Sequence, residues 1–232
     1  MYAAAHHVLT TARRLGLSHT AQLATENLLS STLGDGARQR LHRGLNARSH
    51  AAFDRRNGTD TALPPGNPDE PTDERSFANI LRLLEIDRGR YDWIDIGCGK
   101  GRTVVLAARA GFRRVFGVDL NESYVAAAAA NLEIAAPGLQ QRVELSAGDI
   151  RHWSLPPTDQ VLFCFNPFGP DILRAVLERV ADPAPGHRIF VYYNAVHRQA
   201  AEPFINSGRL RRRIDTQLLY NDCLILETPA GD

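Results

Sequence analysis

The sequence predicts an α/β fold built on an open, mostly parallel β-sheet, with a helical appendage at the N-terminus. Three observations support this prediction. Residues 91–102 (YDWIDIGCGKGR) join an apolar run to a glycine turn and then to a small-residue helical pattern, which is typical of a strand-turn-helix unit in such a sheet. After it, short apolar runs and amphipathic helical patterns follow one another. Before it, residues 1–57 contain helical patterns separated by glycine.

The chain divides by pattern into an N-terminal helical cap and loop, residues 1–73, and a main domain, residues 74–232. Within the cap, Ala3–Leu15, Ala21–Leu33 and Arg38–Phe53 place apolar side chains at three- and four-residue spacings. These helices are expected to cover a ligand, to form a homodimer surface or to serve as a plain structural appendage.

A loop and a further helix precede the first strand. Asn57–Pro71 is rich in Gly, Pro, Asn and Asp, the residues that dominate turns, and is predicted to be a loop. It is interpreted as an ordered lid over a ligand or as a linker. Thr72 or Asp73 is then expected to cap a helix over Glu74–Leu84, whose apolar residues share one face.

The rest of the chain supplies further strands and helices. After the first strand, strands are predicted over Val115–Asp119, from Val143 to Asp149, over Gln160–Phe165 and Arg188–Tyr193, near Leu210–Leu219 and over Cys223–Glu227. Helices are predicted over Asp171–Val180 and Val196–Ile205.

Composition limits the classes of function. With 44% apolar and 23% charged residues the chain has the composition of an ordinary globular protein, and a net charge of +1 predicts no polyanionic partner. Cys98, Cys164 and Cys223 are scattered, so we expect buried thiols and neither a disulfide framework nor a metal site. Without a bilayer-length apolar run or a signal pattern, a cytoplasmic enzyme with no membrane partner is expected.

The glycine turn favours a cationic ligand. A dinucleotide fingerprint would need glycine at position 102, where the chain has Arg102. Asp95 precedes Gly97 by two residues, and a carboxylate facing the turn would repel a pyrophosphate. S-adenosylmethionine (SAM) fits this setting because it carries a sulfonium and an ammonium but no phosphate.

Two more acids follow predicted strands. Asp119 ends the second strand and is expected to accept from both hydroxyls of a ribose. Asp149 ends the third strand and is expected to accept from an adenine amino group, with Leu120 and Ile150 on either side of the ring. Taken singly, each acid is equally well explained as a strand-end or helix-capping residue.

Together, Asp95-x-Gly97-x-Gly99-x-Gly101, Asp119 and Asp149 resemble the motif series of class I SAM-dependent methyltransferases. The resemblance covers roughly residues 75–230. It implies a Rossmann-like, seven-stranded sheet with an antiparallel last strand, SAM across the ends of the first strands, and S-adenosylhomocysteine (SAH) as product. GCGKGRTVVLAA, CFNPFG, YYNAVHR and the upstream FDRRNGTDT resemble more narrowly a group of small bacterial members of mostly unassigned substrate.

The fourth strand ends in Asn166, Pro167, Phe168 and Gly169. Asn166 and Pro167 offer carbonyl oxygens that can hold the hydrogens of an amine, and Phe168 offers a ring for stacking. The segment is similar to the N-P-P-[YF] motif of adenine and glutamine N-methyltransferases, but its second proline is missing, which weakens the implied nitrogen specificity. The alternative is a proline-stopped strand with a core phenylalanine.

The sequence therefore leaves the methyl acceptor open. We expect a methyltransferase acting on a small molecule or a protein side chain, with nitrogen as the acceptor atom. The alternatives are an O-methyltransferase with His197 as base and a SAM-binding protein without catalysis. Nucleic acid is not expected, because the one basic cluster, Arg209 to Arg213, is better explained as a charged edge strand.

Overall fold

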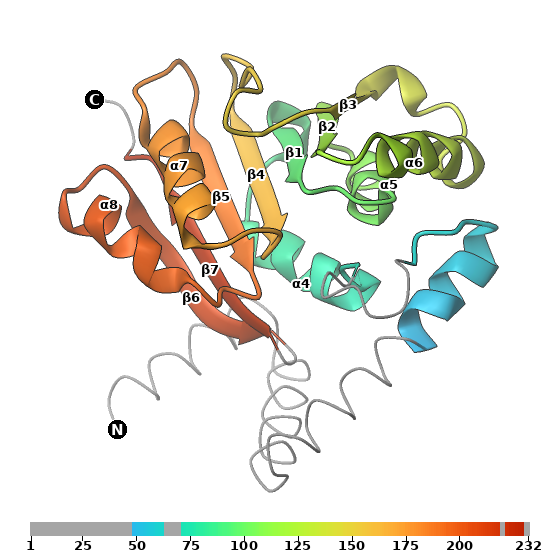
Figure 1. Cartoon of the computed structure of the whole chain (residues 1–232), viewed down its shortest axis with the longest axis horizontal. Helices are drawn as coiled ribbons and strands as arrows, with labels where there is room; N and C mark the ends of the chain where they lie inside the picture. Colours follow the sequence, from blue (N-terminus) through green and yellow to red (C-terminus); the bar gives the residue numbers. More distant parts are fainter. Residues whose placement is uncertain (1–47, 63–70, 219–220, 230–232) are drawn as a thin grey trace, which may run out of the picture.

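A seven-stranded sheet forms the centre of the structure, a computed structural model that describes residues 48–62, 71–218 and 221–229 (Figure 1). The strand order is β3-β2-β1-β4-β5-β7-β6. The strands are β1 (Asp92–Ile96), β2 (Arg114–Asp119), β3 (Val143–Ala147), β4 (Gln160–Phe165), β5 (Arg188–Tyr193), β6 (Arg211–Leu218) and β7 (Asn221–Glu227). The predicted α/β fold is confirmed.

The directions and the order of the strands determine at which edge of the sheet a ligand can bind. Strands β1 to β5 are parallel, whereas β7 pairs antiparallel with both β5 and β6. The predicted insertion of an antiparallel last strand is thus confirmed. The chain moves outward from β1 to β3 and then returns to place β4 on the other side of β1. Ligands of open α/β sheets bind at the carboxyl ends of the strands beside such a reversal.

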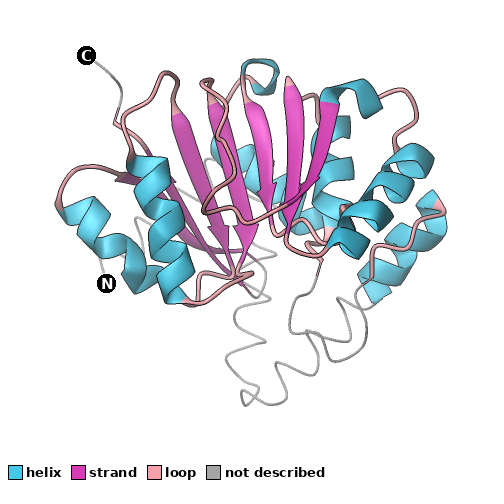
Figure 2. Cartoon of the chain, turned by 45° about the horizontal axis from the view of Figure 1, so that its top comes forward, coloured by secondary structure: helices cyan, strands magenta, loops and turns pink. Residues whose placement is uncertain are grey.

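Helices cover both faces of the sheet (Figure 2). Buried residues of α4 (Glu74–Leu84), α5 (Arg102–Arg109) and α6 (Glu122–Ala135) form one apolar cluster with the sheet. Those of α7 (Pro170–Ala181) and α8 (Glu202–Asn206) form a second cluster on the opposite face. Short 3₁₀ turns complete the chain: η1 (Arg88–Arg90), η2 (Gln140–Arg142) and η3 (Arg198–Ala201).

The central strand β1 is buried along its whole length. Its alternating side chains divide between the two clusters, Trp93 on one face and Ile94 on the other, as strand geometry requires. The Trp93 ring lies with its centroid 5.3 Å from that of Phe77, 5.0 Å from Phe112 and 5.3 Å from Phe163. This aromatic packing gives a rigid base to the turn that follows β1.

Several predicted boundaries were wrong. The third strand ends at Ala147, because residues 148–153 form turns in which the amides of His152 and Trp153 donate to the carbonyl of Asp149. The predicted helix over Val196–Ile205 is divided into η3 and α8, and Val196 is exposed.

The described part of the N-terminal region also differs from the prediction. Residues 48–57 are helical, so the helix that was expected to end at Phe53 continues into the predicted loop. Asp73 caps α4 through bonds from the amides of Arg75 and Ser76, which leaves Thr72 outside the cap. The predicted helices Ala3–Leu15 and Ala21–Leu33 lie outside the described residues, and the division of the chain at residue 73 stays a prediction.

Candidate functional site

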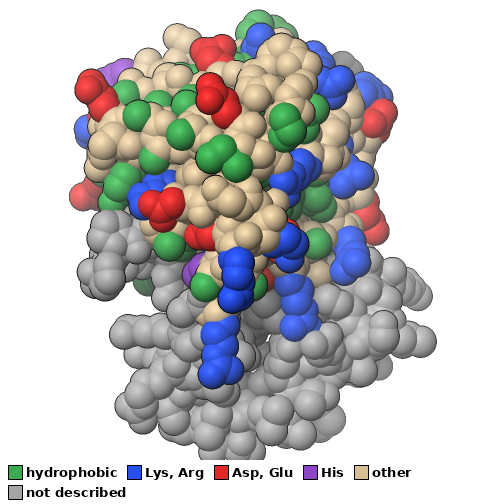
Figure 3. Space-filling view, turned by 90° about the vertical axis from the view of Figure 1, so that its right-hand side faces the viewer, with side chains coloured by type: hydrophobic (Ala, Val, Ile, Leu, Met, Phe, Trp, Pro, Cys, Tyr) green, Lys and Arg blue, Asp and Glu red, His purple; other side chains and the backbone are tan. Residues whose placement is uncertain are grey.

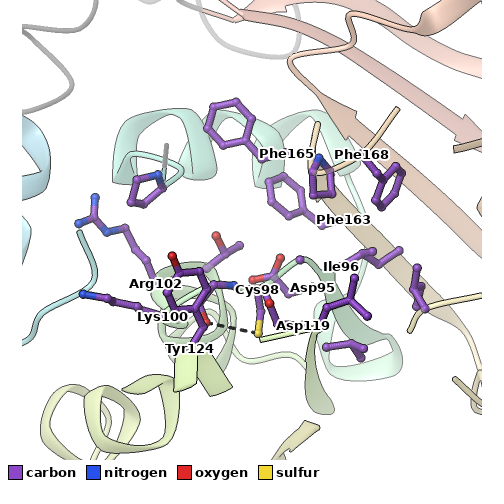
Figure 4. A pocket seen from close by; sticks show the side chains of 18 of the residues that line it. Asp95, Ile96, Cys98, Lys100, Arg102, Asp119, Tyr124, Phe163, Phe165 and Phe168 are labelled. Carbon is purple, nitrogen blue, oxygen red and sulfur yellow. Dashed lines mark hydrogen bonds between the residues drawn. The ribbon is translucent and has the colours of Figure 1, made fainter. Parts of the chain in front are cut away.

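A cavity of about 240 Å³ opens at the carboxyl ends of β1, β2 and β4 (Figure 4). It is far larger than the ~30 Å³ that one water molecule occupies in the liquid. Its lining comes from the glycine turn after β1, the turns after β2, β3 and β4, and helices α5, α6 and α7. Thr61, Pro71 and Thr72 from the region before the first strand also line it. All the predicted cofactor-binding residues except Gly101 and Asn166 are among the lining residues.

The glycine turn needs glycine for steric reasons at two positions. Gly97 has φ +74°, and a Cβ there would lie 2.7 Å from the Cβ of Pro167. Gly101 has φ +81°, and its Cβ would lie 2.7 Å from the Cβ of Ala128 on α6. Both positions are left-handed and crowded, so side chains are excluded. The turn after β1 and the turn after β4 are therefore in direct contact.

Asp95 lies at the floor of the cavity and is only 3% exposed. Within the part of the chain that the structure describes, its Oδ2 atom has no hydrogen-bond partner. Burial, and then the nearby carboxylate of Asp119, raise the pKa of Asp95 well above its usual value. A buried carboxyl group of this kind is suited to a cationic ligand, which would stabilise its charged form.

Asp119 is fixed at the glycine turn. Its Oδ2 accepts from the amide of Gly99 at 2.9 Å, and its Oδ1 accepts from the amide of Asn121 at 2.9 Å. Each carboxylate oxygen keeps acceptor capacity beyond these single bonds. Asp119 therefore lies at the cavity with acceptor capacity left, and its role toward a ribose stays a prediction.

Asp149 lies in the same cavity but is already engaged. Both of its oxygens accept from the Arg151 guanidinium, at 2.9–3.0 Å from Nε, and Oδ1 accepts from the Arg151 amide. These bonds lower the pKa of Asp149 to about 2. An adenine amino group would have to share this carboxylate with Arg151, which the sequence did not indicate. Leu120, 75% exposed, and Ile150 also line the cavity.

Of the residues that were predicted to act at the turn after β4, some line the cavity and one does not. Pro167 and Phe168 line the cavity, and Phe165 beside them does so too (Figure 4). Asn166 does not line it: this residue has φ +43°, and its Oδ1 accepts a 2.7 Å bond from the hydroxyl of Tyr192. Asn166 therefore belongs to the support of the turn in this structure.

His197 is likewise absent from the cavity lining. Its backbone amide donates to the Tyr192 hydroxyl at 3.2 Å. Tyr192 thus joins the turn after β4 to the loop after β5, where Asn194 has a second left-handed non-glycine backbone, φ +55°. Burial raises the pKa of Tyr192 to about 12, so it remains a hydroxyl that both donates and accepts.

Replacing Tyr192 by phenylalanine should release both loops. The amide of His197 would lose its acceptor, and its hydrogen exchange should accelerate about fivefold, the factor that corresponds to ~1 kcal/mol. Hydrogen-exchange mass spectrometry over residues 194–197 measures this. Tyr193→Phe is the matched control, because the Tyr193 hydroxyl bonds Ser76 and Asn221 instead. Equal exchange in both variants would contradict the role given to Tyr192.

Residues 48–62, which we call the N-terminal strap, reach the cavity with Thr61 and bind Arg102. This arginine, the first residue of α5, is 2% exposed. Its guanidinium donates to Thr61 Oγ1 at 2.7 Å from Nε and to Asp54 at 3.4 Å, and it contacts His50. It also lies 4.7 Å from the ring centroid of Phe53. Burial lowers its pKa to about 10, so it stays charged at neutral pH.

A second anchor joins the strap to the glycine turn. The Asn131 side chain on α6 accepts from the amide of Asp60 at 2.9 Å and donates to the carbonyl of Asp60 at 2.9 Å. It also donates to the carbonyl of Lys100 at 3.0 Å, and Lys100 forms a 2.9 Å ion pair with Asp60. These contacts were not predicted, although FDRRNGTDT had been singled out as a motif.

The described residues contain neither a metal-binding cluster nor a membrane-spanning helix. No group of three or more His, Cys, Asp or Glu residues within the described ranges is arranged to hold a metal ion. Within the same ranges, no helix is both long and apolar enough to span a bilayer. The three cysteines are buried, and burial raises the pKa of the Cys98 thiol.

Comparison with known families gives a match at this site. A family model described as a methyltransferase domain matches residues 94–182, from β1 to the end of α7. No curated protein matches the sequence.

Solved structures share the fold at low sequence identity. An RNA methyltransferase from Salinibacter ruber, in complex with SAH, is 20% identical and covers 70% of this chain and 95% of its own, with a TM-score of 0.55. Magnesium protoporphyrin IX methyltransferase from Synechocystis PCC 6803, with bound SAM, is 16% identical over 66% and 78%, with a TM-score of 0.53. A SAM-dependent O-methyltransferase from Thermotoga maritima is 18% identical over 72% and 69%, with a TM-score of 0.53. The three differ in the acceptor for which they are named.

Proposed function

We propose that this chain is a SAM-dependent methyltransferase that transfers the methyl group to a neutral nitrogen atom of a small molecule or a protein side chain, held beside Pro167 and Phe168. The observation that carries the proposal is the composition of the turn after β4. It lines the cavity with a proline and two aromatic rings, Phe165 and Phe168, and with no ionisable side chain.

The cavity fits SAM in its charge and shape. Asp95 offers a buried carboxyl group whose Oδ2 has no partner among the described residues, which suits the ammonium or sulfonium of SAM. Asp119 is oriented for a ribose, and Leu120 and Ile150 give apolar surface for a purine. Arg102, which would attract a pyrophosphate, is already held by the strap.

The supply of proton acceptors favours nitrogen over oxygen. Bound SAM supplies an electrophilic methyl group, and a neutral amine or ring nitrogen attacks it with its own lone pair. An alcohol would need a base to remove its proton. No histidine is among the described residues that line the cavity, and burial disfavours the thiolate of Cys98. The three aspartates of the lining, Asp95, Asp119 and Asp149, are assigned to the cofactor in this proposal. The task of the chain is to orient the lone pair and to exclude water.

The acceptor end is suited to a flat, apolar group. Phe165 packs on Tyr193 with ring centroids 4.8 Å apart, so its position is fixed. Phe168 and Ile172 are partly buried beside the second core cluster. Aromatic rings held in this way stack on planar groups and contribute about 0.5–1.5 kcal/mol beyond the buried area. His197, the base of the O-methyltransferase alternative, is not among the residues that line the cavity.

Nucleic acid is disfavoured as acceptor because the arginines of the basic cluster are paired with carboxylates. Arg209 to Arg213 precede or lie on β6, at the edge of the sheet. The four arginines pair with carboxylates: Arg209 with Glu178 and Asp182, Arg211 and Arg213 with Glu227, and Arg212 with Glu202. Paired guanidinium groups are poorly available to phosphates, and a charged edge strand resists aggregation.

The test combines cofactor binding with transfer to matched acceptors. Calorimetric titration with SAH, SAM and NADH should show binding of the first two only. Transfer of labelled methyl from SAM is then measured on flat small molecules that share a ring system and differ in an amino or a hydroxyl group, and on peptides with amine and amide side chains. Methylation of hydroxyl compounds alone would overturn the nitrogen assignment, and NADH binding alone would overturn the cofactor.

Asp119→Ala should weaken SAH binding by about tenfold or more. The change removes the acceptors proposed for the ribose and leaves the amide of Gly99 without its 2.9 Å bond. Hydrogen bonds to charged groups contribute ~1.5–3 kcal/mol each. Calorimetry of the variant beside the native protein measures the loss, and Asp171→Ala, an exposed acid on α7, is the control. An unchanged affinity would remove Asp119 from the cofactor site.

A further inference from the structure

Thr72 carries a buried hydroxyl group and lines the cavity. It lies directly before Asp73, which caps α4, and it is 2% exposed. Its Oγ1 has no hydrogen-bond partner among the described residues, yet the residue lines the cavity. Buried hydroxyl groups in native proteins are almost always bonded. A hydroxyl that the fold leaves unbonded and that faces a cavity indicates contact with a ligand.

Asp95 Oδ2 is the matching atom. Among the described residues that line the cavity, Thr72 and Asp95 are the two whose buried side-chain oxygens have no partner. One is a hydroxyl that can donate and the other a carboxylate that accepts. The other charged groups of the lining have partners: Asp119 accepts from two backbone amides, Arg151 binds Asp149, Lys100 pairs with Asp60, and Arg102 pairs with Asp54.

An α-amino-acid group has the complementary chemistry. Its ammonium donates hydrogen bonds and its carboxylate accepts them, with both groups on one carbon atom. We propose that the hydroxyl of Thr72 donates to the carboxylate of the amino-acid end of SAM, while Asp95 accepts from its ammonium. The proposal rests on the proposed function and adds to it a residue outside the class I motif series.

Two features support this placement. The positive charges of Lys100 and Arg102 line the same cavity, so a ligand carboxylate is favoured there even though each cation has its own partner. The position of Thr72 is also fixed from both sides of the chain. Asp73 holds the start of α4, and Ser76 on its first turn bonds the buried hydroxyl of Tyr193 at 2.8 Å.

The experiment compares two ligands on one variant. SAH carries the α-amino-acid group, and 5′-methylthioadenosine has the same thioether nucleoside without it. Thr72→Val keeps the shape of the side chain and removes the hydroxyl. By calorimetry, its affinity for SAH should fall about tenfold to a hundredfold, as expected for a lost bond to a charged group, and its affinity for 5′-methylthioadenosine should not change.

The controls separate the outcomes. Thr72→Ser should restore most of the SAH affinity, and the melting temperature of Thr72→Val without ligand should equal or exceed that of the native protein, because the variant buries no unbonded hydroxyl. An unchanged SAH affinity, or an equal loss for both ligands, would overturn the role of Thr72. Native protein that binds 5′-methylthioadenosine and SAH equally would overturn the amino-acid site, and native protein that binds neither would overturn the proposed function itself.

Discussion

Arg102→Leu is expected to destabilise the protein by about 3–5 kcal/mol, the usual effect of removing one partner of a buried ion pair. In a domain of this size that lowers the melting temperature by roughly 6–20 °C. The variant loses the bonds to Thr61 and Asp54 and leaves the carboxylate of Asp54, whose side chain is 14% exposed, without its cation. The N-terminal strap should detach, and SAH affinity should fall with it.

Calorimetry and limited trypsin digestion measure this result. The strap carries Arg55 and Arg56, both exposed, so a detached strap should be cut there faster than in the native protein. Arg102→Lys should be intermediate, because lysine keeps the charge but not the planar fork of donors. Arg174→Ala, which breaks an exposed ion pair on α7, should change stability by less than ~0.5 kcal/mol. Unchanged digestion and SAH affinity in Arg102→Leu would show that the strap is not anchored by Arg102.

Asp95→Asn should move stability and binding in opposite directions. The native carboxyl is buried and its pKa is raised, so its ionised form is unfavourable without a ligand. Asparagine removes this cost, and the melting temperature should rise by about 2–4 °C for each 1 kcal/mol gained. SAH affinity should fall about tenfold to a hundredfold, because a charged acceptor for the ammonium is lost.

The pH dependence of this effect has a definite sign. Because the folded-state pKa of Asp95 lies above the unfolded value, the folded protein keeps the proton to higher pH than the unfolded chain. Stability therefore falls as pH rises from about 4 through the folded-state pKa. Asp119 is the charged neighbour that contributes to the shift. The stability gain of Asp95→Asn should be larger at pH 8 than at pH 4, as measured by thermal unfolding, and the same gain at both values would contradict the raised pKa of Asp95.

The sequence predicted the features that depend on local chain geometry. Glycine at a reversal and an acid at a strand end are determined by backbone conformation within a few residues. Gly97, Asp95 and Asp119 therefore lie at the cavity, as expected from the sequence. The alternation of apolar strands and amphipathic helices likewise predicted the sheet, whereas the antiparallel direction of β7 was implied only by the resemblance to class I methyltransferases.

Features that depend on side-chain competition were not predictable in this way. Asn166 was expected to face the acceptor, but the hydroxyl of Tyr192 on the neighbouring strand bonds its side chain. Asp149 was expected to be free for adenine, but Arg151 occupies it. A partner in space can take an acceptor that the sequence shows as unoccupied. Thr72 was considered only as a helix cap, because its single signal, an unbonded hydroxyl, exists only after folding.

The strap has a consequence for the order in which the protein assembles during synthesis. Asp60 is separated by 71 residues from Asn131, and Asp54 by 48 residues from Arg102. At ribosomal rates of 5–20 residues per second, Asp60 waits roughly 4–14 s for its partner to be made. The strap is thus synthesised before the residues on α5 and α6 that hold it. We therefore expect a nascent chain to reach full affinity for SAH only after α6 has been synthesised and the strap has bound to it.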